Sequence, residues 1–203
     1  QSQRIMIAMA LANEPDLLDL MTQCGFYSAF VGIETPDVSS LALTRKHQNT
    51  RRPLTESVDR ITRSGIRVMA GFIIGFDGEQ AGAGQRIVDF VEETGISTAA
   101  VTLLQALPDT GLWKRLELEG RLLDASGDIT VATLMNFTPT RPLEEIVAEC
   151  DETVWALYDP MRYLDRTYRY FQILGTPASK PSPQRPGRRE LVALAIVCWR
   201  QGA

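Results

Sequence analysis

The chain has 203 residues, 44% of them hydrophobic and 23% charged, which is ordinary for a soluble globular protein. Its formal net charge of -4 argues against a general nucleic-acid-binding surface, so we expect no nucleic acid among its partners. Its three cysteines, Cys24, Cys150 and Cys198, have neither zinc-knuckle nor iron–sulfur spacing and are too few for a disulfide scaffold. We therefore expect no metal ligands within this chain, and a reducing, cytoplasmic location.

The two ends of the sequence give little information about targeting. The chain starts at Gln1 and enters an apolar run at once, and it stops at Ala203 without a tail, so we expect it to be cut from a longer protein. The apolar run at residues 191–199 is too short to cross a bilayer, which takes about 20 residues. No transmembrane segment is expected.

Up to residue 123 the sequence repeats one unit, a strand followed by a helix. Strands are predicted at residues 4–10, 29–33, 67–74 and 99–104. The second of them is a continuous apolar run, as expected for a strand covered on both faces. The predicted helices include one that is capped by Asn13 with Pro15 in its first turn, and others at residues 53–64, at 85–93 and up to Glu119. Because a glycine follows each helix, this alternation predicts an α/β fold with a parallel sheet and right-handed crossovers.

After Gly120 the character of the sequence changes. A polar connector is predicted at residues 124–138, followed by helices at 143–157 and 160–174. In the second of these helices the aromatic residues are expected to pack against other helices: Tyr163, Tyr168, Tyr170 and Phe171. A proline-rich linker and a final helix, residues 190–200, complete the chain. We therefore predict three parts: residues 1–123, 124–175 and 176–203.

The most informative segment is the strand at residues 67–74, which ends in a Gly-x-Ile-x-Gly pattern formed by Gly71, Ile73 and Gly75. A strand followed by a glycine-rich turn and a helix is where parallel α/β folds bind ligands. Glycine allows a flat ligand to lie against the backbone, because no Cβ stands in the way. The alternative is a buried strand whose glycines serve helix packing.

Four segments in this order resemble the radical S-adenosylmethionine superfamily: FVGIETP (30–36), GIRVMAGFIIGFD (65–77), LLQALPDTGLWKRLELEGRL (103–122) and NFTP (136–139). They look most like the branch that carries a cobalamin-binding domain before the barrel and a helical domain after it. The resemblance covers residues 1–174 and implies a partial (β/α) barrel with parallel strands, followed by an α-helical C-terminal domain. On this reading residues 1–123 are the second half of the barrel, and the missing N-terminal half of the same protein is their partner.

The resemblance also implies cofactors. The family uses S-adenosylmethionine and a [4Fe-4S] cluster held by a CxxxCxxC loop, which this chain lacks, so the cluster ligands are expected outside it. Cobalamin is implied through a domain that is also outside the chain. The Gly71, Ile73 and Gly75 pattern matches the family's adenine-binding strand, Glu34 matches a polar residue that contacts the ribose or methionine part, and Gln105 borders the adenine.

Other polar residues have weaker assignments. Lys46, Gln48 and Asn49 match a pattern common in this branch and are candidates for substrate binding, although a solvated loop explains them equally well. Glu34 has an alternative of its own, as a loop cap or as the partner of Arg45. Asp77 and Glu79 are predicted to cap the following helix rather than to act as a pair of catalytic carboxylates.

The resemblance implies a radical C–H functionalisation, such as methylation or rearrangement, of a small or lipid-like substrate. Catalytic residues are not identified. Two alternatives stay open: a methylthiotransferase, and a degenerate barrel that binds a ligand or partner without catalysis.

Overall fold

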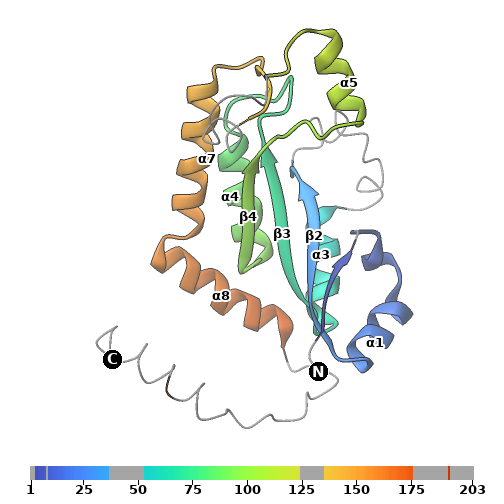
Figure 1. Cartoon of the computed structure of the whole chain (residues 1–203). Coiled ribbons are helices and arrows are strands. Elements are labelled where there is room, and N and C mark those ends of the chain that lie inside the picture. Colours follow the sequence, from blue (N-terminus) through green and yellow to red (C-terminus); the bar gives the residue numbers. More distant parts are fainter. Residues whose placement is uncertain (1–2, 8, 37–52, 124–134, 176–191, 193–203) are drawn as a thin grey trace.

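The computed structural model describes residues 3–7, 9–36, 53–123, 135–175 and 192. Four strands form one sheet in the order in which they occur along the chain: β1 (Gln3–Ile7), β2 (Phe26–Glu34), β3 (Arg67–Ile74) and β4 (Thr98–Leu103). Each strand pairs with the next in parallel, so all their carboxyl ends lie at the top of Figure 1. The predicted α/β class and parallel sheet are confirmed, while the partial barrel stays a prediction.

Helices connect and flank these strands: α1 (Pro15–Gln23), α3 (Leu54–Arg63), α4 (Ala83–Thr94), α5 (Gly111–Leu118), α7 (Leu143–Leu157) and α8 (Pro160–Leu174). The bounds predicted for β3, α7 and α8 are confirmed. Helix α8 has a clear start, because Asp159 accepts hydrogen bonds from the backbone N–H groups of Met161 and Arg162, both at 3.1 Å.

The beginning of the chain corrects two predictions. The first strand ends at Ile7 rather than at residue 10, and a 3-10 helix, η1 (Met9–Asn13), follows it. The apolar side chains of Met9 and Leu11 are buried there, beside α3. This apolar run therefore contributes to the core from a helical turn rather than from a strand. Asn13 does not cap α1, since the capping position belongs to Glu14, whose side chain makes no capping bond.

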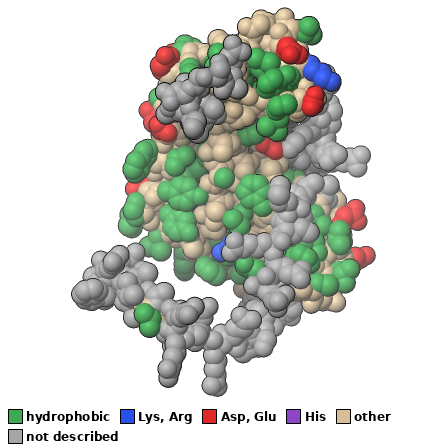
Figure 2. Space-filling model, viewed as in Figure 1, with side chains coloured by type: hydrophobic (Ala, Val, Ile, Leu, Met, Phe, Trp, Pro, Cys, Tyr) green, Lys and Arg blue, Asp and Glu red, His purple; other side chains and the backbone are tan. Residues whose placement is uncertain are grey.

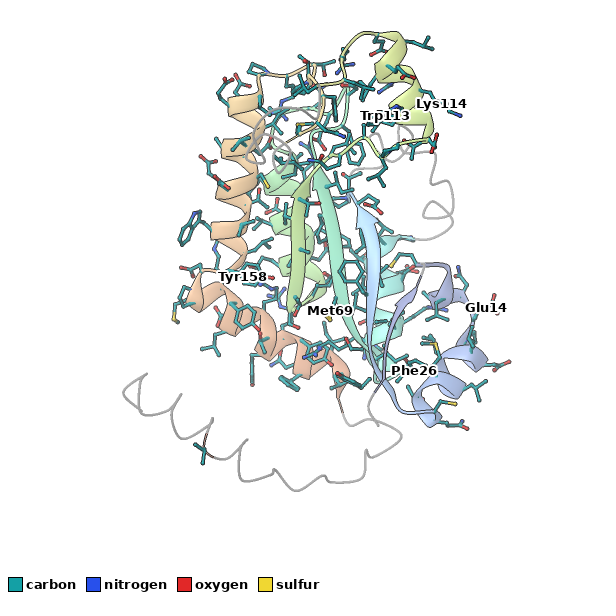
Figure 3. All side chains as sticks on the ribbon, in the orientation of Figure 1. Glu14, Phe26, Met69, Trp113, Lys114 and Tyr158 are labelled. Atoms are coloured by element: carbon teal, nitrogen blue, oxygen red, sulfur yellow. The ribbon has the colours of Figure 1, made fainter. Side chains whose placement is uncertain are left out.

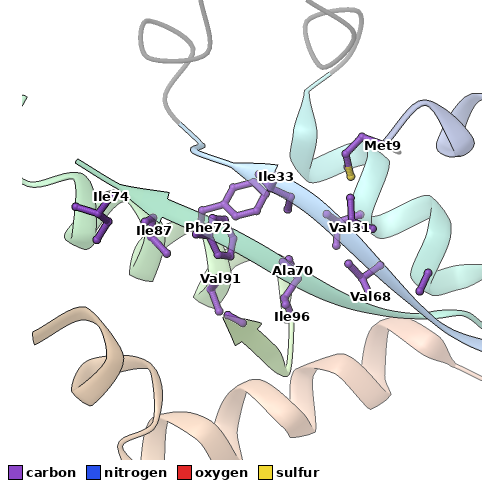
Figure 4. Packing of buried hydrophobic residues seen from close by; sticks show 14 of the residues in the cluster. Met9, Val31, Ile33, Val68, Ala70, Phe72, Ile74, Ile87, Val91 and Ile96 are labelled. Carbon is purple, nitrogen blue, oxygen red and sulfur yellow. The ribbon is translucent and has the colours of Figure 1, made fainter. Parts of the chain in front are cut away.

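The core lies between one face of the sheet and helices α3 and α4, which stand behind it in Figure 1. Along β3 burial alternates, and the residues that face these helices are Val68, Ala70, Phe72 and Ile74. Figure 4 shows them packed with Ile87 and Val91 of α4 and with Val31 and Ile33 of β2. Burial alternates in the second half of β2 as well, which corrects the prediction that the strand at residues 29–33 is covered on both faces. Within the described chain, helices cover only one face of the sheet.

The other face of the sheet, which we call the open face, is covered by no described helix (Figures 1 and 2). It consists of Phe30, Gly32, Met69, Gly71, Ile73, Ala100 and Thr102, which are half-buried or exposed. Gly32, Gly71 and Ala100 are register neighbours on three adjacent strands. They form a flat strip across the sheet, since none carries a side chain larger than methyl.

The two C-terminal helices pack directly on the strand–helix units. Helix α7 contacts α4 and β4, and α8 contacts α3. The α4–α7 contact is close at Gly84, whose backbone N–H donates to Glu149 Oε1 at 3.0 Å. On α8, Arg166 is only 1% exposed and donates to Leu157 O at 2.6 Å and Glu92 Oε1 at 3.1 Å.

The aromatic residues of α8 divide between its two sides. Tyr170 is buried as predicted, and Tyr163 stacks on Tyr158 with ring centroids 6.0 Å apart. The prediction is wrong for Tyr168 and Phe171, which are 66% and 60% exposed. The predicted final helix lies outside the described residues except for Val192. Among the helices that the structure describes, none has the length and apolar character needed to cross a membrane.

Candidate functional site

The candidate site is the rim formed by the carboxyl ends of β2, β3 and β4. Glu34 is the last residue of β2, Gly75 directly follows β3, and Gln105 follows β4 by two residues. Because the strands are parallel neighbours, the structure brings these three predicted residues to the same end of the sheet. The predicted substrate-binding residues, Lys46, Gln48 and Asn49, lie outside the described residues, as does Arg45.

Glu34 has an unusual backbone. Its φ is 70°, in the left-handed region that side-chain-bearing residues rarely adopt. The N–H of Thr35 donates to Ile33 O at 2.9 Å across it, and the pairing with β3 shifts between Gly32 and Glu34. Non-glycine residues in this conformation cluster at functional sites, where the surrounding structure maintains the strain. This geometry turns the chain sharply where β2 reaches the rim.

Gly71 and Ile73 lie on the open face, below the rim. A Cβ placed on Gly71 would come within 2.9 Å of Phe30 Cζ and 3.3 Å of its Cε1. The ring of Phe30 therefore lies against the bare backbone of Gly71. The glycine admits a flat aromatic group at this point, and in this structure that group belongs to the chain itself.

Gly75 has a different environment. Its φ is 103°, and an added Cβ would meet Met135 Cε at 3.1 Å and Ile146 Cγ2 at 3.4 Å. Its N–H donates to Glu79 Oε2 at 2.7 Å. The second glycine of the motif thus shapes the turn after β3 and faces the C-terminal segments.

Glu79 is a buried carboxylate, only 3% exposed. Its Oε1 has no hydrogen-bond partner within the described part of the chain. Burial raises the pKa of the Glu79 carboxyl above its ordinary value, in spite of the bond from Gly75. The prediction that Glu79 caps the next helix is wrong, because α4 begins after Gly82 and the carboxylate instead closes the turn after β3.

Asp77 does not cap α4 either. Arg121 donates to its two oxygens at 2.8 and 2.9 Å, and Arg115 donates to Oδ2 at 2.7 Å. The hydrogen bond from Arg121 holds the pKa of the Asp77 carboxyl below its ordinary value. Asp77 therefore ties the turn after β3 to the end of α5, with both carboxylate oxygens already bonded to guanidinium groups.

A side chain that sequence reasoning missed holds the segment after β4. Asn136 Oδ1 accepts from the N–H of Ala106 at 2.8 Å, and Asn136 Nδ2 donates to Ala106 O at 2.7 Å. These residues line a cavity of about 590 Å³ together with Gln105, Cys150 and other residues of the β4 end and α7. The signals for Asn136 in the sequence were its place at the start of the NFTP segment and its position as one polar residue between two apolar ones, Met135 and Phe137.

Among the described residues, no group of three or more histidine, cysteine, aspartate or glutamate side chains is arranged so that it could hold a metal ion. The two described cysteines lie on separate elements: Cys24 is exposed at the end of α1, and Cys150 is half-buried on α7. Burial also raises the pKa of the Cys150 thiol, which opposes the thiolate form that metals require.

Two curated proteins resemble this chain along 95% of its length. One, from Synechocystis sp. (strain ATCC 27184 / PCC 6803 / Kazusa), is named an uncharacterized methyltransferase and is 58% identical over 193 residues. The other is the hopanoid C-2 methylase of Rhodopseudomonas palustris (strain TIE-1), 33% identical over 198 residues. The chain spans 36% of the length of each of them. Residues 110–203 match a family described as a domain of unknown function, DUF4070.

Proposed function

We propose that this chain is part of a radical S-adenosylmethionine methyltransferase that acts on a lipid-like substrate. The observation that carries the proposal is the location of Gly71 and Ile73 on an open sheet face, below a rim that holds Glu34, Gly75 and Gln105. The names of the two relatives support methylation rather than methylthiolation or binding alone. Since the chain spans about a third of those relatives, the activity belongs to the longer protein.

The residues of the open face and rim fit S-adenosylmethionine. In this structure the ring of Phe30 lies against Gly71 in the strip formed with Gly32 and Ala100. A bound adenine would replace that ring or lie next to it, beside Ile73. The Glu34 carboxylate can accept hydrogen bonds from two ribose hydroxyls, and the Gln105 amide can both donate to and accept from a base. When bound, S-adenosylmethionine and a reduced [4Fe-4S] cluster would supply the radical that removes hydrogen from a substrate carbon. Cluster and cobalamin ligands would come from outside this chain.

The open face also suits an apolar substrate. Phe30, Met69 and Ile73 are half-buried and contribute apolar surface beside the glycine strip. Figure 3 shows Met69 on β3, projecting from the lower part of the sheet. A mostly apolar site with a few polar groups is typical of small-molecule pockets. A hopanoid-like lipid, which the name of one relative indicates as the substrate of that protein, would match such a surface.

Binding of the cosubstrate tests the role of Glu34. In the full-length protein, carrying a reconstituted cluster under anaerobic conditions, Glu34→Gln should weaken S-adenosylmethionine binding by about 1–3 kcal/mol, the range for hydrogen bonds to a charged group. The amide retains the shape of the side chain and removes its charge. Isothermal titration measures the affinity, and Glu14→Gln, an exposed glutamate next to α1, is the matched control. Equal affinity of the Glu34→Gln and wild-type proteins would remove Glu34 from the site.

Product analysis tests the reaction itself. The wild-type protein should form 5′-deoxyadenosine and transfer the deuterated methyl group of labelled S-adenosylmethionine to a lipid from an extract of the source organism. Incorporation of sulfur along with the methyl group would favour the methylthiotransferase alternative. Binding of S-adenosylmethionine without any cleavage would favour the non-catalytic alternative.

A further inference from the structure

We infer that Asn136 is a positioning residue, which sets the side chain of Gln105 by holding the backbone next to it. This inference rests on the proposed function, since Gln105 matters only if the rim binds a ligand. Asn136 comes from the segment before α7, 30 residues beyond Ala106, so the contact joins two distant parts of the chain.

The backbone on both sides of Gln105 is fixed. The N–H of Leu104 donates to Ile74 O at 2.9 Å and extends the pairing of β4 with β3. Ala106 makes its two bonds with Asn136, at 2.8 and 2.7 Å. Leu104 and Ala106 are 8% and 1% exposed. Gln105 lies between these two fixed and buried neighbours, is itself half-buried, and lines the cavity at the end of β4.

Asn136 is itself held firmly. Its neighbours Met135 and Phe137 are 0% and 1% exposed. Its own carbonyl accepts from the N–H of Leu123 at 3.0 Å, and Phe137 forms an antiparallel bridge with Leu122. The side-chain amide of Asn136, fixed in this manner, offers one acceptor to the N–H of Ala106 and one donor to its carbonyl, as the backbone of a neighbouring strand would. Through its two hydrogen bonds with Ala106, Asn136 therefore holds the residue beside Gln105 in a fixed position relative to the segment before α7.

A second side chain makes the same kind of bridge and provides a control. The hydroxyl of Tyr158 accepts from the N–H of Ala99 at 3.3 Å and donates to Ala99 O at 2.8 Å. Ala99 lies near the beginning of β4, at the end of the strand away from the rim, and Figure 3 shows Tyr158 there. Tyr158→Phe thus removes two similar bonds to the same strand without affecting the rim.

The test compares Asn136→Leu, which keeps nearly the same side-chain size and loses both bonds, with Tyr158→Phe in the full-length protein. Titration calorimetry gives the affinity for S-adenosylmethionine, and thermal unfolding gives the stability. We expect both variants to unfold at lower temperature, but only Asn136→Leu to bind S-adenosylmethionine more weakly, by about tenfold. Amide hydrogen exchange should become faster in residues 104–107 in Asn136→Leu alone.

A double-mutant cycle separates positioning from a direct or purely structural role. If Asn136 acts through Gln105, the double variant Asn136→Leu/Gln105→Ala should bind no more weakly than Gln105→Ala alone. A further tenfold loss in the double variant, or an unchanged affinity of Asn136→Leu, would overturn the inference. If the wild-type protein does not bind S-adenosylmethionine at all, the proposed function fails and this role fails with it. Wild-type binding that Asn136→Leu retains in full refutes only the role of Asn136.

Discussion

The close contact between α4 and α7 at Gly84 gives a sharp test of the structure. A Cβ placed on Gly84 would overlap Thr153 Oγ1 and lie 3.1 Å from Glu149 Cγ and 3.2 Å from Glu149 O. The hydroxyl of Thr153 cannot turn away freely, because it donates to Glu149 O at 2.6 Å. The carbonyl is backbone, so it moves only if α7 moves. Gly84→Ala must therefore push the two helices apart.

Two opposing effects determine the size of the change. Alanine is favoured over glycine inside a helix by about 1 kcal/mol. An extra methyl group in a tightly packed contact costs typically 1–3 kcal/mol, and the immobile partners here favour the upper part of that range. The net loss should be about 1–2 kcal/mol. For a chain of this size each kilocalorie lowers Tm by about 2–4 °C, so we expect a decrease of roughly 2–8 °C.

Thermal unfolding followed by circular dichroism measures this decrease. The matched control is Gly111→Ala, because among the described residues no atom beyond its own stretch of backbone lies within 4 Å of an added Cβ there, and Tm should not fall. In a Thr153→Ala background, Gly84→Ala should cost less, since the overlapping hydroxyl is gone. A Gly84→Ala variant that melts at or above the wild-type temperature would show that α4 and α7 do not meet as described.

Two carboxylates give opposite pH dependences. Burial raises the pKa of Glu79 in the folded protein, so the folded state keeps the carboxyl proton to higher pH than the unfolded state does. The stability that this proton contributes is lost as the pH rises from the ordinary pKa of 4.5 through the pKa of the folded protein. Urea unfolding at several pH values should show this loss in the wild type and not in Glu79→Gln; parallel pH profiles would contradict it. The hydrogen bond from Arg121 lowers the pKa of Asp77, so its contribution is present above the ordinary value of 3.8 and is lost as the pH falls through the folded value. Asp77→Asn should cost about 1–2 kcal/mol at neutral pH and less in acid, and a cost independent of pH would refute the ion pairing.

Much of the fold follows from local sequence. The strand at Arg67–Ile74 and both C-terminal helices were predictable because apolar periodicity and proline or glycine boundaries agree there. The first strand was predicted too long because Met9 and Leu11 are apolar. Their side chains are buried in the core from a 3-10 helix, and composition alone does not distinguish such a helix from a strand. Two-sided burial was also overestimated, since a run of apolar residues looks the same whichever face the helices cover.

The candidate site was predictable only in part. Parallel strands bring their carboxyl ends together, so the meeting of Glu34, Gly75 and Gln105 at one rim follows from the order of the elements. The contacts of Asn136 and Glu79 were not predictable, because each side chain bonds a backbone group whose position depends on the tertiary fold. The helix-cap assignment for Asp77 failed for the same reason, as its arginine partners lie 38 and 44 residues away.

The order of the strands in the sheet has a consequence for how the chain folds during synthesis. Each strand pairs with the one made just before it, so the sheet can grow one unit at a time as the chain leaves the ribosome. Among the described helices α7 and α8 are made last, and they cover α4 and α3. A nascent chain that has reached α5 would still expose the side of α4 around Gly84 and Val88. This side of α4 therefore stays uncovered until α7 emerges and packs against it.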